Sequence, residues 1–586
     1  MTDERGSARY KGVGIAIGFL MALLVFRLVT LHLGLTEQAR KPVAQARSYH
    51  ETLAVERGRI LDGSASANIL AVNVGVKDIC AVPALLVASN RVAAAAQALA
   101  PILGLAPTAI VSRIDEPTRR FAYVQRYVPD DKAAIVTGVV GRLKLAGIYT
   151  TPSMTRSYPQ GEMLCHVLGF VNYDGVGSAG LEQQLEMHLR GKPGVLVSRL
   201  DGHHHEVPGY RTLEVPAKDG EDVSLTIDQQ LQYMMEKALS GALERNHAKA
   251  GWAIMERIRT GEILALVSRP GFDPNDFRTA TDEQKLNRAI GYTYEPGSTF
   301  KVGVIAAALN EGVVTPETVF NCENGHWLYQ NKILHDAHPY GELCVADILK
   351  KSSNIGAAKI ALLLGPARLD RYLREFNIGR KLGIDLPGEE SGILWPLSKW
   401  SAISSSRIAM GQGVAVTGLQ MLGVLCGIAN DGVVMKPYVI KQIMDADGKV
   451  VLRNVPQQLG HPIRSDTADL MRRLLTRVTE PGGTGVKAAV EGFKVAGKTG
   501  TAQKVMGGHY SETDYMASFV GFLPADNPEI GMIVVIDDPQ PLHTGGTVSA
   551  PVFGEVAEQA ARYLGFIPPA AAIAENLAAQ QRSRAP

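Results

Sequence analysis

Tyr-Glu-Pro-Gly-Ser-Thr-Phe-Lys, residues 294–301, is the stretch on which the interpretation of this sequence depends. From Ser298 onward, apolar residues recur at helical spacing as far as Leu309, and Gly312 provides a stop signal. Ser298 and Lys301 are three positions apart, so they share one face of the predicted helix. The stretch therefore predicts a helix that presents a serine and a lysine together at its start.

A serine and a lysine placed in this way can act together as a nucleophile and its general base. A serine hydroxyl attacks poorly until a neighbouring group takes its proton, and a neutral amine one turn away from Ser298 can do so. The start of a helix also favours negative charge that develops at the serine. By itself the pair is weak evidence, because an ordinary solvated helix start has the same pattern.

Two further motifs follow downstream, Ser352-Ser353-Asn354 and Lys498-Thr499-Gly500. Serine-x-x-lysine, serine-x-asparagine and lysine-threonine-glycine in this order are typical of penicillin-binding proteins and β-lactamases. With its further blocks, the chain resembles a class B penicillin-binding protein, a peptidoglycan D,D-transpeptidase, and most closely the division-specific (FtsI-type) branch. The blocks that resemble this branch are His335 to Gly341, Ser352 to Ala358, Leu386 to Glu389 and Gly545 to Phe553.

The second motif is predicted to lie in the turn between two helices, one from Cys344 to Lys350 and one from Ile355 to Leu364. A hydroxyl at Ser352 can relay protons, and an amide at Asn354 can bind a peptide carbonyl of the substrate. For either residue alone, helix capping is the simpler interpretation. The presence of the other two motifs favours the catalytic one.

The third motif is predicted to lie on the first strand of an antiparallel meander, with strands near 494–504, 516–523 and 531–536. A substrate peptide can pair with this strand while Lys498 and Thr499 or Thr501 hold its terminal carboxylate. Gly500 is expected to leave room for the substrate backbone. The resemblance implies that the backbone N–H groups of Ser298 and Thr501 form an oxyanion hole. The predicted catalytic residues are Ser298, Lys301, Ser352, Asn354, Lys498 and Thr501, and the predicted substrate-binding residues are Thr499, Gly500 and Thr501.

The two lysines need different charge states. An exposed lysine has a pKa of about 10.4, so Lys301 acts as a base at neutral pH only if burial and a nearby cation lower its pKa. Lys498 is the expected cation. Whether Lys301 alone takes the proton of Ser298, or Ser352 and Lys498 share the task, stays open at this level.

The composition limits which partners, disulfides and metal sites can be expected. The 586 residues include 60 basic and 58 acidic ones, for a net charge of +2, so nothing indicates a nucleic-acid partner. Cys322 and Cys344 bracket a polar loop and either pair or remain buried thiols, and buried thiols are the favoured interpretation. His203-His204-His205-Glu206 follows a turn signal and is interpreted as a solvated loop, so no metal or cofactor is expected. The five cysteines are too few and too scattered for a disulfide scaffold: Cys80, Cys165, Cys322, Cys344 and Cys426.

The predicted fold is multidomain α+β with one N-terminal transmembrane helix. Residues 1–11 are assigned to the cytoplasm, 12–33 to a signal anchor, 34–222 to a linker and non-catalytic pedestal (dimerisation-type) domain, 223–566 to the transpeptidase domain, and 567–586 to a mobile tail. In the transpeptidase domain, the antiparallel sheet is expected to pack between helices. A cleaved signal peptide is the competing interpretation of the apolar run, but no small-residue cleavage site follows it closely. Basic residues flank the run on both sides, so the positive-inside rule decides the orientation of the helix only weakly. The location of the expected substrate has to decide it.

The pedestal carries two blocks that resemble class B signatures, Arg57 to Asp62 and Arg156 to Gly194. Both consist of turn glycines, prolines and short apolar segments. We expect them to be structural, and we assign no catalytic role to the pedestal.

The resemblance implies that two acyl transfers cross-link stem peptides in septal cell-wall synthesis, with β-lactams as covalent inhibitors. It places the catalytic part outside the cytoplasmic membrane. Expected partners are stem peptides, lipid-linked glycan strands, divisome membrane proteins and a SEDS glycosyltransferase (FtsW-type), because no glycosyltransferase domain fits between the anchor and the catalytic part. The enzyme alternatives are an elongation-specific transpeptidase, a D,D-carboxypeptidase and a β-lactamase. The non-enzyme alternatives are a β-lactam sensor and a divisome scaffold.

Overall fold

The computed structural model of the chain describes residues 4–46, 48–201, 206–207, 209, 211 and 213–568. It divides into two compact units, one of residues up to Glu56 with Arg190–Gly220, and one of Arg57–Leu189 with the chain from Glu221 onward. The histidines 203–205 and most of the predicted mobile tail lie outside the described residues. The predicted domain boundaries differ from this division and stay predictions.

The first unit begins with one long helix, α1 (Glu4–Ala46). Its segment Tyr10–Leu33, 24 residues, is long and apolar enough to cross a membrane, and no other helix of the described chain is. The predicted anchor, residues 12–33, lies inside this segment. The unit also holds a small antiparallel sheet in which β6 (Gly194–Leu200) pairs with β1 (Ser48–Leu53), β7 (Glu206–Val207) and β8 (Leu213–Val215).

The second unit contains a seven-stranded sheet that joins distant parts of the chain. Strand β9 (Asp222–Leu225) pairs in parallel with β2 (Ile60–Leu61) and antiparallel with β17 (Ile440–Met444). The sheet continues through β3 (Ile69–Ala81), which pairs with both β4 (Ala122–Val128) and β5 (Ile148–Ser157), and β18 (Val450–Arg453) forms the other edge. Helices α2 (Pro83–Ala88), α3 (Val92–Leu103), α4 (Pro107–Ile114) and α5 (Asp130–Leu143) share one buried apolar cluster with β3, β4 and β5.

The two signature blocks meet in a buried ion network. Arg57 Nε lies 2.6 Å from Glu182 Oε2, and Arg156 Nε lies 2.7 Å from Glu182 Oε1. The Glu182 side chain is 0 % exposed, so both guanidinium groups compensate one buried carboxylate. Arg57 also contacts Glu186. These contacts support the structural interpretation of the blocks.

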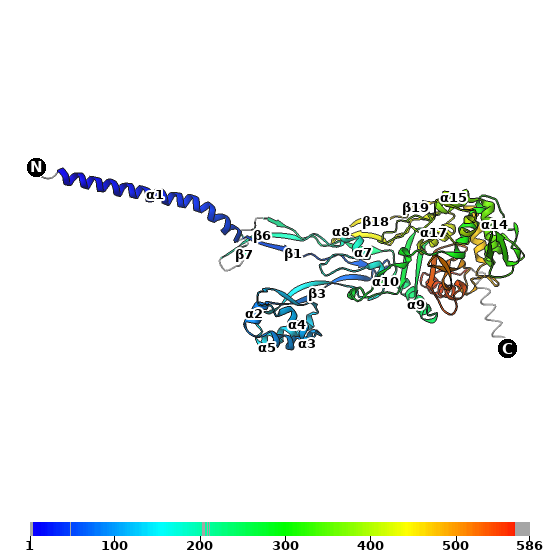
Figure 1. Cartoon of the computed structure of the whole chain (residues 1–586), viewed down its shortest axis with the longest axis horizontal. Helices are drawn as coiled ribbons and strands as arrows, with labels where there is room; N and C mark the ends of the chain where they lie inside the picture. Colours follow the sequence, from blue (N-terminus) through cyan, green and yellow to red (C-terminus); the bar gives the residue numbers. More distant parts are fainter. Residues whose placement is uncertain are drawn as a thin grey trace. The chain divides into compact units, whose positions relative to one another are not determined.

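A five-stranded antiparallel sheet in the order β11-β10-β22-β21-β20 carries the third motif. It belongs to the same unit as the strands β3 and β18 that are labelled in Figure 1. The strands are β10 (Ala250–Arg257), β11 (Glu262–Arg269), β20 (Ala496–Met506), β21 (His509–Leu523) and β22 (Ile530–Asp537). The predicted meander is therefore present, and β20, which carries the third motif, is an edge strand. An edge strand has free backbone groups with which a peptide can pair.

The two faces of this sheet bury different helices. Ala253 and Met255 on β10 belong to the same apolar cluster as α9 (Gln229–Arg245) and α20 (Ala550–Tyr563). Trp252 and Ile254 belong to the opposite cluster, with α12 (Lys301–Asn310), α14 (Asn354–Leu364) and α17 (Gly418–Ala429). This alternation follows from the period of two along a strand. The predicted arrangement of an antiparallel sheet between helices is thus confirmed.

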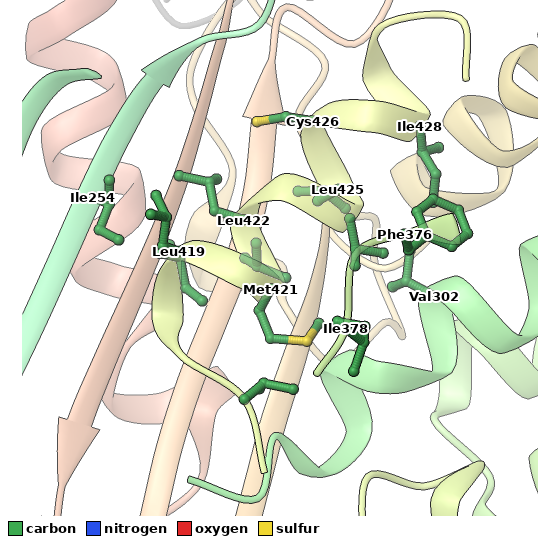
Figure 2. Close-up of a cluster of buried hydrophobic side chains, with 14 of the residues drawn as sticks. Ile254, Val302, Phe376, Ile378, Leu419, Met421, Leu422, Leu425, Cys426 and Ile428 are labelled. Atoms are coloured by element: carbon green, nitrogen blue, oxygen red, sulfur yellow. The ribbon is translucent and has the colours of Figure 1, made fainter. Parts of the chain in front are cut away.

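Helix α17 packs against β10 and β22 of the sheet and also against α12, the helix that follows Ser298. Figure 2 shows Leu419 and Leu422 of α17 on the side of Ile254 of β10. On the opposite side of the helix, Ile428 lies against Phe376. Every residue of α17 is buried, so this helix lies in the interior of the domain.

Shorter elements complete the second unit. The helices are α6 (Cys165–Leu168), α7 (Gly180–Gln184), α8 (Glu186–Leu189), α10 (Asp282–Lys285), α11 (Arg288–Gly291), α13 (Val345–Lys351), α15 (Pro366–Glu375), α16 (Ser404–Ile408), α18 (Ser465–Thr476) and α19 (Gly545–Val548). The strands are β12 (Val319–Asn321), β13 (His326–Tyr329), β14 (Lys332–His335), β15 (Glu342–Cys344), β16 (Val434–Met435) and β19 (Gln458–Gly460).

The cysteines are free thiols. Cys322 is buried and Cys344 half-buried, and they do not form a disulfide. Cys344 donates to Asp347 instead, and Cys322 Sγ lies 3.4 Å from Ser353 Oγ. The described residues also contain no cluster of side chains that can hold a metal ion.

Candidate active site

Ser298 lies in a short 3₁₀ helix, Gly297–Phe300, directly before α12. The predicted helix therefore begins three residues later than expected, at Lys301. Gly297 has a φ of +56°, and a Cβ there would lie 2.8 Å from the carbonyl oxygen of Thr501. The tight turn thus needs glycine, because it brings the serine up against strand β20.

Lys301 is the centre of the cluster. Its side chain is completely buried, and its Nζ lies 3.0 Å from Ser298 Oγ. The same Nζ lies 2.6 Å from the Ser352 carbonyl oxygen, 3.2 Å from Ser352 Oγ and 2.7 Å from Asn354 Oδ1. One amine therefore joins the first motif to the second.

Ser352 reaches this position because the backbone turns sharply between α13 and α14. Its φ is +62°, in the left-handed region, which costs on the order of 1–3 kcal/mol for a residue other than glycine. Ser353, the next residue, caps α14 by accepting from Gly356 N–H at 2.9 Å. The capping role expected for a serine of this motif thus belongs to Ser353, which leaves the Ser352 hydroxyl free for the cluster.

Lys498 brings in the third motif. Its side chain is also completely buried, and its Nζ lies 2.9 Å from Ser352 Oγ. Further contacts run to the Thr499 carbonyl at 3.1 Å and to Thr499 Oγ1 at 3.3 Å. The Ser352 hydroxyl is therefore placed between two lysine amines, and the three motifs converge.

The two threonines are held by neighbours outside the motifs. Thr499 Oγ1 lies 2.7 Å from Thr484 Oγ1, and Thr501 Oγ1 accepts from Gly545 N–H at 3.2 Å. Thr501 is the more exposed of the two. Their roles in binding a carboxylate stay predictions, as does the oxyanion hole.

The packing of β20 requires a glycine at position 500. A Cβ at this position would lie 2.3 Å from Ser518 Oγ and 2.9 Å from Thr299 Cγ2. Real Cβ atoms essentially never approach so closely, so glycine is required for β20 to pack against β21 and the serine turn. That Gly500 also leaves room for a substrate backbone stays a prediction.

Burial sets the charge state of the cluster. Burial lowers the pKa of Lys301 to about 7, while the Asp336 carboxylate opposes the shift. Burial, and then the charge of Lys301, lowers the pKa of Lys498 well below its usual value. Burial is the main cause of the low Lys301 pKa, as expected. The Lys498 charge is not among the causes for Lys301, and the repulsion between the two ammonium groups instead lowers the pKa of Lys498.

Asp336 is a member of the site that the sequence did not predict. Its carboxylate accepts from Ser353 Oγ at 2.6 Å, from Ile355 N–H at 3.0 Å and from Asn354 N–H. A carboxylate at the start of α14 stabilises the helix and fixes the turn that carries Ser352. The sequence signal at Asp336 is the block His335 to Gly341, which resembles the division-specific branch but does not by itself indicate a role for the carboxylate.

The chain matches two protein families. Residues 213–558 match the family described as "Penicillin binding protein transpeptidase domain", and residues 52–225 match "Penicillin-binding Protein dimerisation domain". The fold and the three converging motifs define a serine acyl-transfer protein of the penicillin-recognising class. The chain belongs to the penicillin-binding protein transpeptidase family, and its two-domain composition is that of class B.

Relatives cover most of the chain. "Peptidoglycan D,D-transpeptidase FtsI" of Escherichia coli (strain K12) is 33 % identical over 530 residues, 89 % of this chain and 86 % of that protein. "Stage V sporulation protein D" of Bacillus subtilis (strain 168) is 32 % identical over 562 residues, 94 % of this chain and 85 % of that protein. Among solved structures, a peptidoglycan synthetase from Bifidobacterium adolescentis has a TM-score of 0.70 at 28 % identity, covering 89 % of this chain and 98 % of that one. Penicillin binding protein 3 from Mycobacterium tuberculosis, complexed with aztreonam, has a TM-score of 0.68 at 26 % identity with the same two coverages.

Proposed function

We propose that the chain is a peptidoglycan D,D-transpeptidase that cross-links stem peptides through an acyl-enzyme on Ser298. The observation that carries this proposal is the contact of 3.0 Å between Lys301 Nζ and Ser298 Oγ inside a buried cluster. The relative from E. coli carries this activity in its name, which supports the proposal.

The first step forms the acyl-enzyme. Neutral Lys301 takes the proton of Ser298 while Oγ attacks the carbonyl carbon between the two terminal D-alanines. The C–N bond breaks, and the departing amine of D-alanine receives a proton through Lys301 or the Ser352 hydroxyl. Lys498 and the threonines hold the terminal carboxylate during this step.

The second step releases the enzyme. An amine of a neighbouring stem peptide attacks the ester carbon, its proton passes to the lysine–serine cluster, and the bond from carbon to Ser298 Oγ breaks. The products are the cross-linked peptide and the free serine. A β-lactam acylates Ser298 in the first step and, because its leaving amine stays attached, persists as a covalent adduct.

Labelling with a fluorescent penicillin, followed by peptide mapping, tests the proposal. We expect one adduct, on the peptide that contains Ser298, and no adduct on the Ser298→Ala variant. The Ser112→Ala variant, changed at an exposed serine of α4, is the matched control and should be labelled normally. An adduct on Ser298→Ala, or none on the unaltered chain, contradicts the assignment.

We further propose a septal role. Its support is the likeness to the FtsI branch, although a sporulation protein of B. subtilis is also among the relatives. A septal enzyme predicts that depletion in the source bacterium blocks division and gives filaments. Rounded cells would indicate the elongation role instead.

Added D-amino acid should enter the product of the purified enzyme, whereas a D,D-carboxypeptidase would give only hydrolysis.

The membrane arrangement follows from the same chemistry. We propose that residues 1–11 are cytoplasmic, that 12–33 cross the membrane, that residues 34–222 form the linker and pedestal, and that the transpeptidase domain (223–566) lies outside the cytoplasmic membrane, where its substrate is. A SEDS glycosyltransferase (FtsW-type) and divisome membrane proteins are the proposed partners. Protease added to intact spheroplasts should cleave the chain beyond α1, and protection of the whole chain contradicts this orientation.

A further inference from the structure

A cavity of about 690 Å³ adjoins the catalytic cluster. Asn354 belongs to both, because its Oδ1 contacts Lys301 Nζ at 2.7 Å and its side chain also lines the cavity. Gln503 and Tyr510, from β20 and β21, line another part of the wall. The cavity is large enough for one or two amino-acid residues. Asn354 joins it to the cluster, because it contacts Lys301, which in turn contacts Ser298.

The direction of β20 indicates which part of a substrate enters this cavity. The proposed carboxylate site is at Lys498 to Thr501, and Gln503 follows two residues further along the same strand. A peptide that pairs antiparallel with β20 has its terminal carboxylate near Lys498 and its preceding residues near Gln503. The residue before the two terminal D-alanines therefore reaches the cavity.

The cavity wall is cationic. Lys332, Lys399 and Arg407 line it, and no aspartate or glutamate does. Within the part of the chain that the structure describes, none of the three forms an ion pair with a carboxylate. Arg407 Nη2 only approaches the Ile333 carbonyl at 3.5 Å, so most of its donors are available.

Aromatic side chains hold part of this charge in place. Lys399 Nζ lies 4.8 Å from the centre of the Trp395 ring, a cation–π distance. Trp400, whose indole N–H donates to the Trp395 carbonyl at 3.0 Å, completes an apolar wall beside the cations. A ligand with an aliphatic stem and an anionic end matches both features.

Glu295, a carboxyl group that contacts the wall residues Gly413 and Tyr510, does not neutralise these cations. Glu295 Oε1 accepts from Gly413 N–H at 2.8 Å and from Tyr510 at 3.3 Å, and its Oε2 is buried without a hydrogen-bond partner. Burial raises the pKa of Glu295, which disfavours its negative charge. The cavity therefore keeps an excess of positive charge.

We propose that this cavity selects acyl donors in which the residue before the two D-alanines carries a free side-chain carboxylate. Arg407 and Lys399 bind the carboxylate, Lys332 adds to the positive field, and Trp395 and Trp400 contact the aliphatic stem. The inference rests on the proposed function, since it describes the donor of that reaction. Arg407, Lys399 and Lys332 are specificity-determining residues, and the bond-making steps are unchanged.

Two synthetic donors that differ only in charge test the proposal. The first is N-acetyl-L-2-aminoadipyl-D-alanyl-D-alanine, and the second is its side-chain amide. We expect the full-length protein in detergent to release D-alanine from the acid with a kcat/KM about tenfold or more above that for the amide. The preference should shrink as salt is added, because the wall is open to solvent.

Variants of the cavity residues test whether the cavity causes the preference for the acid donor over the amide. Arg407→Gln, and separately Lys399→Gln, should bring the ratio of the two kcat/KM values toward one, whereas Lys441→Gln, changed at an exposed lysine of β17 outside the cavity, should keep the ratio. Penicillin labelling of each variant shows that its active site has folded. Equal rates for the two donors on a chain that penicillin labels overturn the inference alone. A chain that neither binds penicillin nor releases D-alanine contradicts the proposed function as well.

Discussion

Ser352 Oγ lies 3.2 Å from Lys301 Nζ and 2.9 Å from Lys498 Nζ, so one hydroxyl connects two buried amines. Neither amine is well solvated, and burial disfavours the charged form of both. In the proposed mechanism, a proton moves from Ser298 through Lys301 and Ser352 to the leaving amine. Each charged form along this path lies next to a hydrogen-bond partner. We propose that the lowered pKa of Lys301 is the property that allows this cluster to take a proton from Ser298.

The rate of penicillin acylation should depend on this pKa. Lys301 acts as a base only when neutral, and its pKa is lowered to about 7, so the neutral fraction increases as the pH is raised through that value. We expect the second-order acylation rate to rise between pH 6 and 8, about one unit either side of this pKa, and then to level off. Stopped-flow measurements with a fluorescent penicillin give this profile. A rate that stays flat across the range contradicts the role of Lys301.

Removal of the amine should abolish most of the rate. Lys301→Ala is expected to reduce acylation by about 100-fold or more, the usual contribution of a general base. The matched control is Lys441→Gln, which leaves the cluster intact. A Lys301→Ala variant with an acylation rate near that of the unaltered chain would show that another group takes the proton of Ser298.

At the scale of elements, helix α14 and its carboxylate cap hold the second motif. Asp336 binds the first backbone N–H groups of α14 and the Ser353 hydroxyl, and it is also the charge that raises the Lys301 pKa. Secondary structure and titration are thus linked at one residue. We therefore propose that the segment after β14, which carries Asp336, supports catalysis by positioning the second motif.

Asp336→Asn tests both effects, and each has its own measurement. Loss of the negative charge removes the only contribution that raises the Lys301 pKa, so the rise in acylation rate should shift to lower pH. The helix cap weakens as well, with a cost of about 1 kcal/mol in the free energy of unfolding. Asp447→Asn, at an exposed loop position, is the control for both measurements. An acylation profile that moves to higher pH would contradict the assignment.

The buried network of the signature blocks gives an element-scale prediction about stability. Glu182→Gln leaves Arg57 and Arg156 without their shared carboxylate, so we expect the free energy of unfolding to fall by about 3–5 kcal/mol. The matched control is Glu558→Gln, which breaks a surface pair with Arg562 and should cost less than about 0.5 kcal/mol. Denaturant unfolding of both variants compares the two. Similar midpoints would show that the network is dispensable.

At the scale of the whole molecule, the site and the apolar helix belong to different units. Every residue of the catalytic cluster lies in the unit that contains Arg57–Leu189 and the chain from Glu221 onward, and α1 lies in the other. Anchoring and acyl transfer are therefore assigned to separate parts of the chain.

A chain that begins at Ser48 tests this separation. We expect it to remain in the supernatant after centrifugation at high speed and to be labelled by penicillin at the same rate as the full chain in detergent. Sedimentation with membranes would place an additional membrane contact outside α1. Loss of labelling in a soluble, folded chain would show that the helix takes part in forming the site.

The sequence by itself determined the local features of this protein. The three motifs, the antiparallel meander, the apolar N-terminal helix and the turn at Ser352 all follow from spacing and from turn residues, which depend on near neighbours in the chain. These patterns were sufficient for the family and for the motif residues that meet in the cluster, but not for Asp336. They also predicted the helix at Ser298, but three residues too early, because the 3₁₀ turn is imposed by its packing on β20.

Only the tertiary structure decided the properties that arise between distant segments. The contact between Lys498 and Ser352 joins residues 146 positions apart, and Asp336 reaches Asn354 from another loop. The pKa of Lys301, the packing reason for Gly500 and the free thiols of Cys322 and Cys344 depend on burial by such segments. Burial is a property of the assembled core, so no local pattern of residues contains it.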